Sequence, residues 1–328
     1  MNSVNTMENN LNMNNSVKKE KVLKEKTKRL IFYILMAALP ILQTCVFYIY
    51  VNISNIMLAF SEYKYIPGVG HVGHFAWFDN FKSVLSIVFS PEKSSMFGVS
   101  FLMYLFVSCF ATPVSIIFSF YVYKKYPMSE FFRVILFFPQ IISAVIMSSL
   151  YSYVVGEIYM FISGSEWGLF SPINSPISII LTVIIYNLWM GFGANILLAS
   201  GAMSGINESV VESSHLDGCN TVQEFIYITL PSIFPTIITF TVIDLAAVFS
   251  NQMNLYTFFD KDVPGGLESV GYYLYKQTVH SPGMVAEKGL SFLSYPQISA
   301  MGVLITLVVL PVTLTVRRLL EKFGPSVD

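Results

Sequence analysis

An acidic residue, Asp244, lies in the middle of a long apolar segment of the chain. On a helix, Asp244, Ala247, Val248 and Asn251 follow the spacing i, i+3, i+4, i+7, which puts them on one stripe. A polar group in lipid costs free energy unless it faces protein or water, so this stripe is expected to face away from lipid. The carboxyl group could bind an ion or a proton, line a pore or contact another subunit, and these alternatives stay open.

Polar and small residues also interrupt an earlier apolar segment, at Asn187, Trp189, Gly191 and Asn195. Membrane bundles use Asn side chains to bridge neighbouring helices and Gly to let helices approach closely. Helix packing and pore lining are therefore equally good interpretations of each of these residues.

Two histidines, His71 and His74, stand at i and i+3 in a polar stretch, where they could suggest a metal. Zinc sites need further ligands, and no His-Glu-x-x-His motif or nearby Cys and Glu set occurs in the sequence. The phosphate-binding motif Gly-x-x-x-x-Gly-Lys-Ser/Thr is also missing. We therefore expect no metal, no cofactor and no enzymatic activity in this chain. The three cysteines are scattered and predict no disulfide framework.

The composition excludes an ordinary soluble domain, because 54% of the 328 residues are hydrophobic and only 12% are charged. Six segments reach the roughly 20 apolar residues that a bilayer span needs. They are apolar all round rather than along one stripe, which is typical of membrane helices. We predict an all-α polytopic membrane protein with six transmembrane helices, at Leu30–Val51, Phe97–Tyr123, Val134–Val155, Ile177–Met203, Ile233–Phe258 and Gln297–Val316.

The ends of the chain differ from this membrane domain, residues 30–316. The first sixteen residues are rich in Asn and have no apolar run, so they cannot offset the entropy of ordering. We expect residues 1–29 to form a disordered, basic segment and residues 317–328 a short tail. The first apolar segment is too long for a signal-peptide core and is expected to remain as the first membrane helix.

Lys and Arg residues flank the six segments unequally. Clusters precede the first segment, separate the second from the third, and follow the sixth, and all three fall on one face if there are six spans. The side richer in Lys and Arg normally stays in the cytoplasm. Both termini are therefore predicted to be cytoplasmic, with the longer connections at 61–96, 156–176 and 259–296 outside.

The connection between the fourth and fifth segments, residues 204–231, contains no Lys or Arg although it lies on the positive side. Anionic lipid attracts such a loop only weakly, so we expect a protein to cover it. Asn207 is a suitable N-cap for a short amphipathic helix, and Gly218 can turn the chain into a second short helix. Pro231 is then expected in the first turn of the fifth membrane helix.

Seven residues of this connection have a spacing that resembles the cytoplasmic signature of the membrane subunits of binding-protein-dependent ABC importers: Glu212, Ser213, Ser214, Asp217, Gly218, Leu230 and Pro231. The family pattern starts Glu-Ala-Ala, and here serines replace both alanines. The resemblance implies a type I importer permease fold in which this connection is the coupling helix that docks on an ATPase. By the same resemblance, Glu212 would meet the ATPase and Gly218 would allow the bend.

Weaker matches resemble the maltose-type carbohydrate permeases: Phe75–Phe81, Phe132–Arg133, Phe138–Gln140, Trp189 ahead of Gly201, and Phe249 before Asn251. This resemblance makes Asn251 the first candidate for a sugar contact, since amides can hydrogen-bond hydroxyl groups. The other candidates for the substrate pathway are Asn187, Leu188, Met190, Gly191, Ala194, Asp244, Ser250 and Gln252. One departure is Asp262–Gly266, which replaces the Thr-Gly-Gly-Pro usual after helix five, so docking of the binding protein can differ.

The resemblance also implies partners in a prokaryotic cell membrane. They are a second permease subunit of different but homologous sequence, a cytoplasmic ATPase dimer carrying ATP and Mg, an extracellular solute-binding protein, a carbohydrate solute and membrane lipid. No nucleic acid is expected.

Three alternatives remain: an ion-coupled secondary transporter that uses Asp244, an ABC permease for a non-sugar solute, and a membrane enzyme.

Overall fold

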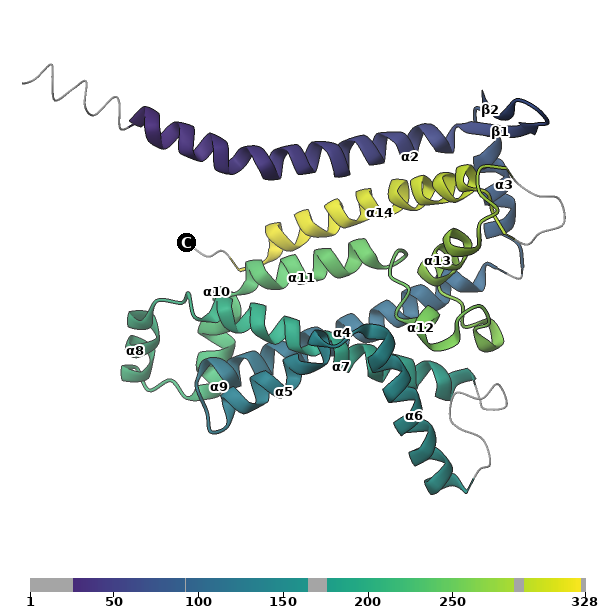
Figure 1. Ribbon diagram of the computed structural model, residues 1–328. Coiled ribbons are helices and arrows are strands. Elements are labelled where there is room, and N and C mark those ends of the chain that lie inside the picture. The colour runs from purple at the N-terminus through teal and green to yellow at the C-terminus, as the bar shows by residue number, and fades with distance from the viewer. Residues whose placement is uncertain (1–25, 92, 165–175, 286–291, 326–328) are drawn as a thin grey trace, which may run out of the picture. The chain divides into compact units, whose positions relative to one another are not determined.

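The computed structural model describes residues 26–91, 93–164, 176–285 and 292–325 (Figure 1). The described part is helical apart from one two-stranded hairpin, as the all-α prediction required. The chain divides into two units, Met1–Leu58 and Ala59–Asp328, and each is described by itself. Residues 1–25 of the N-terminal segment predicted to be disordered, 1–29, lie outside the described residues, whereas its last four residues begin the helix that starts at Lys26 and so are not disordered. Parts of the predicted outer connections, 165–175 and 286–291, also lie outside the described residues.

Five helices of the described chain are long and apolar enough to cross a membrane, and a sixth span results if one bent helix pair is counted. The helix Lys26–Ala59 lies in the first unit except for its last residue; it contains a π-helical turn, Thr44–Tyr50, and ends with α2, Val51–Ala59. The second unit supplies α4, Ser95–Tyr123, α7, Pro176–Met203, and α14, Tyr295–Phe323. These four agree with the predicted first, second, fourth and sixth spans.

The third span differs from the prediction, because Val134–Val155 is not one helix. The chain forms α5, Ser129–Ile141, and α6, Ala144–Ser163, with extended backbone at Ile142 between them. Pro139 removes a backbone donor in the last turn of α5, which weakens the helix where it ends. Helix α6 is long enough to span by itself.

The fifth span also differs, because the helix predicted at Ile233–Phe258 stops early. Helix α11 covers Phe234–Ala247, and a separate short helix, α12, covers Leu255–Phe259. Between them the Asn251 Oδ1 accepts a hydrogen bond from the Met253 N–H at 2.8 Å, and Met253 and Asn254 have positive φ values of 51° and 56°. This local side-chain bond competes with helix continuation.

The chain also bends ahead of α11. The helical stretch Thr221–Ser232 meets α11 at 65°. The expectation that Pro231 lies in the first turn of the fifth membrane helix is therefore wrong: Pro231 belongs to α10, Leu230–Ser232, and Pro235 takes the first turn of α11. Proline suits a first turn because the N–H that it lacks would have no partner there.

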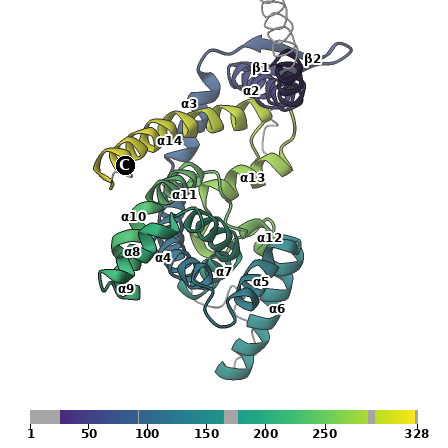
Figure 2. The same ribbon diagram turned by 90° about the vertical axis from the view of Figure 1, so that its left-hand side faces the viewer.

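Helices α4 and α7 lie side by side in both views and form the centre of the second unit (Figures 1 and 2). The Ser119 hydroxyl of α4 donates to the Ile196 carbonyl of α7 at 3.3 Å. Helix α5 also packs against α7, where Gly193 lies against the backbone of Leu136 and Phe137. A methyl group at position 193 would overlap the Leu136 carbonyl oxygen.

We expect Gly193→Val to destabilise the protein by about 1–3 kcal/mol or more, the usual effect of overpacking a close contact. The expected result is a lower midpoint in thermal unfolding of the purified protein. Gly201→Ala on the same helix is the matched control, because a Cβ at position 201 meets nothing within 4 Å. Equal midpoints for the two variants would contradict the close approach of α5 and α7.

One end of the second unit carries several elements that are too short to span a membrane. They are the antiparallel hairpin of β1, Ser61–Ile66, and β2, Gly70–Phe75, the helices α3, Asp79–Val88, and α13, Val270–His280, and a 3-10 turn, Pro264–Gly266. Glu268 pairs with Lys93 at 2.5 Å and Lys276 at 3.4 Å, which ties α13 to the start of α4. The opposite end carries α8, Glu208–Leu216, and α9, Thr221–Glu224 (Figure 1).

Candidate functional site

A cavity of about 360 Å³ lies among α4, α5, α7, α11 and the turn that follows α11. Six residues predicted for the substrate pathway line it together: Asn187, Met190, Gly191, Ala194, Asp244 and Asn251. The stripe predicted on the fifth segment is also present, since Ala247 and Val248 join Asp244 and Asn251 in the lining. Polar residues of two separate apolar segments therefore face one shared space.

Three predicted residues lie outside this lining. Leu188 packs into the apolar cluster around Val183 and Ile184. Ser250 is exposed, and its hydroxyl donates to the Ala247 carbonyl at 3.4 Å. Gln252 is partly buried in the turn after α11 and does not line the cavity.

Asn187 holds the cavity wall together as well as lining it. Its Nδ2 donates to the Val183 carbonyl at 2.8 Å and to the Met253 carbonyl at 2.9 Å, and its Oδ1 accepts from Asn254 Nδ2 at 2.8 Å. These bonds fix the turn after α11 against α7. The sequence left helix packing and pore lining as alternatives for Asn187, and the structure shows that this residue both packs against its neighbours and lines the cavity.

Four polar lining residues were not singled out in the sequence for the substrate pathway: Tyr104 and Ser108 on α4, Gln140 on α5, and Asn254 after α11. Gln140 Nε2 donates to the Met190 carbonyl at 2.8 Å, so it also ties α5 to α7. The signal in the sequence was the i, i+4 spacing of Tyr104 and Ser108 within an apolar segment. Asn195, noted as polar but not assigned to the pathway, lines the cavity too.

The lining combines five carboxamides, two hydroxyl groups and the Asp244 carboxyl group with apolar walls. Carboxamides both donate and accept hydrogen bonds, as the hydroxyl groups of a polyhydroxylated solute require. A few polar groups in an otherwise apolar cavity are typical of small-molecule sites. No Lys, Arg or His lines this cavity in the described part of the chain.

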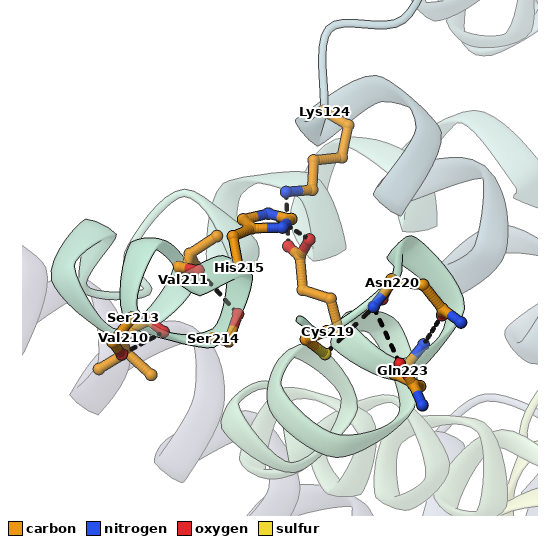
Figure 3. Close-up of polar contacts among 10 residues, drawn as sticks. Lys124, Val210, Val211, Ser213, Ser214, His215, Cys219, Asn220 and Gln223 are labelled. Carbon is orange, nitrogen blue, oxygen red and sulfur yellow. Dashed lines mark hydrogen bonds and ion pairs between the residues drawn. The ribbon is translucent and has the colours of Figure 1, made fainter. Parts of the chain in front are cut away.

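The connection at 204–231 forms the predicted helix, turn and second helix (Figure 3). Asn207 caps α8, with its side chain accepting from the Ser209 N–H at 3.1 Å. Gly218 has a φ of +84°, which glycine adopts readily. A capping box of Asn220 and Gln223 starts α9, which continues through a π-helical turn, Phe225–Thr229, into α10.

Most of the predicted contact residues in this connection face outward. Glu212, Ser213, Asp217 and Gly218 are exposed and Ser214 is half-buried, while Val211 is the one buried residue of α8. Leu230 and Pro231 are half-buried at the other end, where Leu230 packs against a cluster that includes Ile116 and Met203. Apolar side chains are exposed too, with Leu216 at 88%, Tyr227 at 73% and Val222 at 64%.

One carboxylate of this connection is fully buried. Glu224 has no exposed side-chain surface, and its two oxygens lie 2.5 Å from Lys124 Nζ and 3.1 Å from His215 Nε2. In Figure 3, dashed lines lead from both Lys124 and His215 to this carboxylate. The sequence assigned it no role, because nothing in the sequence indicates that Lys124 lies beside Glu224.

The two histidines of the hairpin do not converge. His71 and His74 lie three residues apart on β2, so their side chains are on opposite faces of the strand. Within the described ranges, no three His, Cys, Asp or Glu side chains gather as metal ligands would.

Comparison with known sequences gives a family match over most of the chain. The sequence profile described as "Binding-protein-dependent transport system inner membrane component" matches residues 102–328. The arabinooligosaccharides transport system permease protein AraP of Bacillus subtilis is 26% identical over 208 residues, 61% of this chain and 62% of that protein. The maltose/maltodextrin transport system permease protein MalF of Vibrio vulnificus is 31% identical over 136 residues, 41% of this chain and 26% of that protein. The matched region thus spans less than two thirds of these relatives.

Two solved structures share the fold. One is a bacterial ABC transporter involved in import of the acidic polysaccharide alginate, with a TM-score of 0.66, 18% identity, and coverage of 92% of this chain and 99% of that one. The other is the alginate ABC transporter in complex with an alginate pentasaccharide-bound periplasmic protein, with a TM-score of 0.67, 20% identity, and coverage of 89% and 94%. At these identities the likeness concerns the fold alone.

Proposed function

This chain belongs to the binding-protein-dependent transport system inner membrane components, and we propose that it is the membrane-spanning permease subunit of an ATP-driven importer of oligosaccharides. It is a multi-pass membrane protein with the permease fold. The observation that carries the proposal is the cavity among α4, α5, α7 and α11, where carboxamides and hydroxyl groups gather inside an apolar bundle. Such groups hold a hydroxylated solute while it is out of water.

The exposed face of α8 supports docking of an ATPase. The segment 204–231 carries the acidic residues Glu208, Glu212 and Asp217 and no Lys or Arg, so its exposed surface is complementary to a basic cleft. Leu216 adds an apolar side chain that a partner would cover. In this proposal the segment is the coupling helix, and ATP and Mg are bound by the partner.

The remaining partners follow from the same proposal. A second permease subunit, homologous but different in sequence, completes the pathway, and an extracellular solute-binding protein delivers the solute. Both termini lie in the cytoplasm of a prokaryotic cell. The C-terminal end of α14 and the segment with α8 and α9 lie at the same end of the second unit, which agrees with this orientation (Figure 1).

The solute is proposed from the relatives and the cavity together. The relatives transport arabinooligosaccharides and maltodextrins according to their names. Asn251 is exposed toward the cavity and is the proposed sugar contact. We expect Asn251→Ala to raise the half-saturating solute concentration by about tenfold, because a hydrogen bond of roughly 1–1.5 kcal/mol is lost.

The position of Asp244 in the cavity favours one rival, a secondary transporter that couples solute to ions or protons. Uptake of labelled arabino- and maltooligosaccharides into membrane vesicles separates the two mechanisms. Under our proposal, vanadate stops uptake and a protonophore at constant ATP does not. The rival requires the reverse, together with loss of proton-coupled uptake in Asp244→Asn.

A further inference from the structure

The buried carboxylate of Glu224 joins the neighbouring helices α8 and α9 to the end of α4, which lies far from them along the chain. Glu224 itself ends α9, Lys124 caps the C-terminus of α4, and His215 lies in the last turn of α8. Side-chain exposure is 0% for Glu224 and 20% for Lys124, against 49% for His215. An ion pair that is largely shielded from water is screened little by salt and holds its partners at a defined distance.

The side of the cluster toward α4 is firmly packed. The rings of Phe120 and Phe225 lie 4.9 Å apart, and Lys124 Nζ lies 5.9 Å from the centre of the Phe120 ring. Phe225 and Leu230 join Ile116, Phe120, Met203 and Ile233 in one apolar cluster. The α9 stretch is therefore packed closely against the C-terminal end of α4.

The side toward α8 is held more loosely. Helix α8 buries one residue, Val211, and exposes most of its remaining surface. The contact of His215 with Glu224 adds a link from α8 to the packed side. A force applied to α8 can reach α4 through this link without passing along the backbone of the turn at Gly218.

The middle of α4 lines the cavity through Tyr104, Ser108 and Ala111. We propose that Glu224 is a positioning residue for transport: its carboxylate ties α8, through His215, to Lys124 on the cavity-lining α4. Displacement of α8 by the ATPase then reaches the cavity by this route as well as by the chain through α9, α10 and α11. This inference rests on the proposed function.

The test measures access to the cavity and needs no knowledge of the solute. Cys45, Cys109 and Cys219 are replaced, and Ser108→Cys places one thiol in the cavity. The whole complex, in membrane vesicles, is labelled with a membrane-impermeant maleimide in ATP plus vanadate or in ADP. With Glu224 present we expect the labelling rates in the two states to differ by about fivefold or more, the usual scale of coupling between two sites.

With Glu224→Gln we expect this difference to shrink to about twofold or less, while the ATPase still co-purifies and hydrolyses ATP. Lys124→Gln should give the same loss, and the double variant should be no worse than either single one, because all three break one link. Glu224→Asp, which keeps the charge, should retain part of the difference in labelling rate between the two nucleotide states. Glu130→Gln is the matched control, since Glu130 is exposed in the first turn of α5.

If Glu224→Gln does not accumulate in the membrane, His215→Ala at the exposed rim of the cluster carries the same test. An unchanged labelling difference in these variants would overturn the role of Glu224 and leave the proposed function intact. Loss of the ATPase from the complex would also overturn it, because the residue would then act in docking. No nucleotide-dependent labelling even with Glu224 present would refute the proposed function itself.

Discussion

Replacement of Glu212 by lysine is expected to abolish solute-stimulated ATP hydrolysis and to weaken ATPase binding by about a hundredfold, since a like-charge contact at an interface costs several kcal/mol and each roughly 1.4 kcal/mol is a factor of ten. Glu212 is exposed on α8 and has no ion-pair partner among the described residues. Its charge is therefore available to a partner protein. Co-purification of the ATPase with the permease, and hydrolysis with and without loaded binding protein, measure the two effects.

The control for this variant is Glu130→Lys, an equal charge reversal at an exposed position in the first turn of α5. It should leave both the ATPase content and the stimulation near the values of the unchanged protein. Comparable losses in both variants would mean that general charge at this face, rather than α8, governs binding. Full stimulation in Glu212→Lys would remove Glu212 from the docking surface.

Filling the cavity with a large side chain should also stop transport completely. Gly191 lines the cavity, and a Cβ built there meets no atom within 4 Å, so Gly191→Trp can place an indole ring in the space of about 360 Å³. We expect solute uptake to fall to the level of vesicles without the complex. The turn that precedes α12 lines this cavity, whereas α8 lies at the opposite end of the bundle from α12 (Figure 1). The substitution therefore leaves α8 unchanged, and basal ATP hydrolysis should persist.

Gly201→Trp on the same helix is the matched control. Position 201 is exposed, lies outside the cavity lining and also has nothing within 4 Å of an added Cβ. It should insert and transport nearly as the unchanged protein does. Normal uptake through Gly191→Trp would show that solute follows another path.

Hydropathy predicted the spans that are uninterrupted helices and failed where local chemistry intervenes. Helices α4, α7 and α14 each contain an uninterrupted apolar stretch long enough to span, so residue count and hydropathy locate them. The stop after Ala247 depends on one hydrogen bond from the Met253 N–H to the Asn251 side chain and on two positive φ values. Hydropathy averaged over about 20 residues does not detect such a bond. The break at Ile142 was not predicted for the same reason.

The candidate site was predictable where a polar residue is conspicuous in an apolar segment. Asn187, Asp244 and Asn251 stood out on that ground, and the structure brings them to one cavity. Tyr104 and Ser108 did not, because such residues are frequent in membrane helices and only the packing of α4 against α7 turns them inward. The contact of Lys124 with Glu224 is purely tertiary, so sequence spacing contains no sign of it.

Photocrosslinking from α8 tests most directly whether this chain works with a separate ATPase. A benzophenone amino acid is placed at exposed Ser213, and a second at exposed Lys82 of α3 serves as the control. After illumination of intact cells, mass spectrometry identifies the crosslinked chains. The account predicts a polypeptide with a nucleotide-binding Gly-x-x-x-x-Gly-Lys-Ser/Thr motif at Ser213 and not at Lys82. Efficient crosslinking at Ser213 to lipid or to other proteins, with no nucleotide-hydrolysing chain among the products, would contradict it.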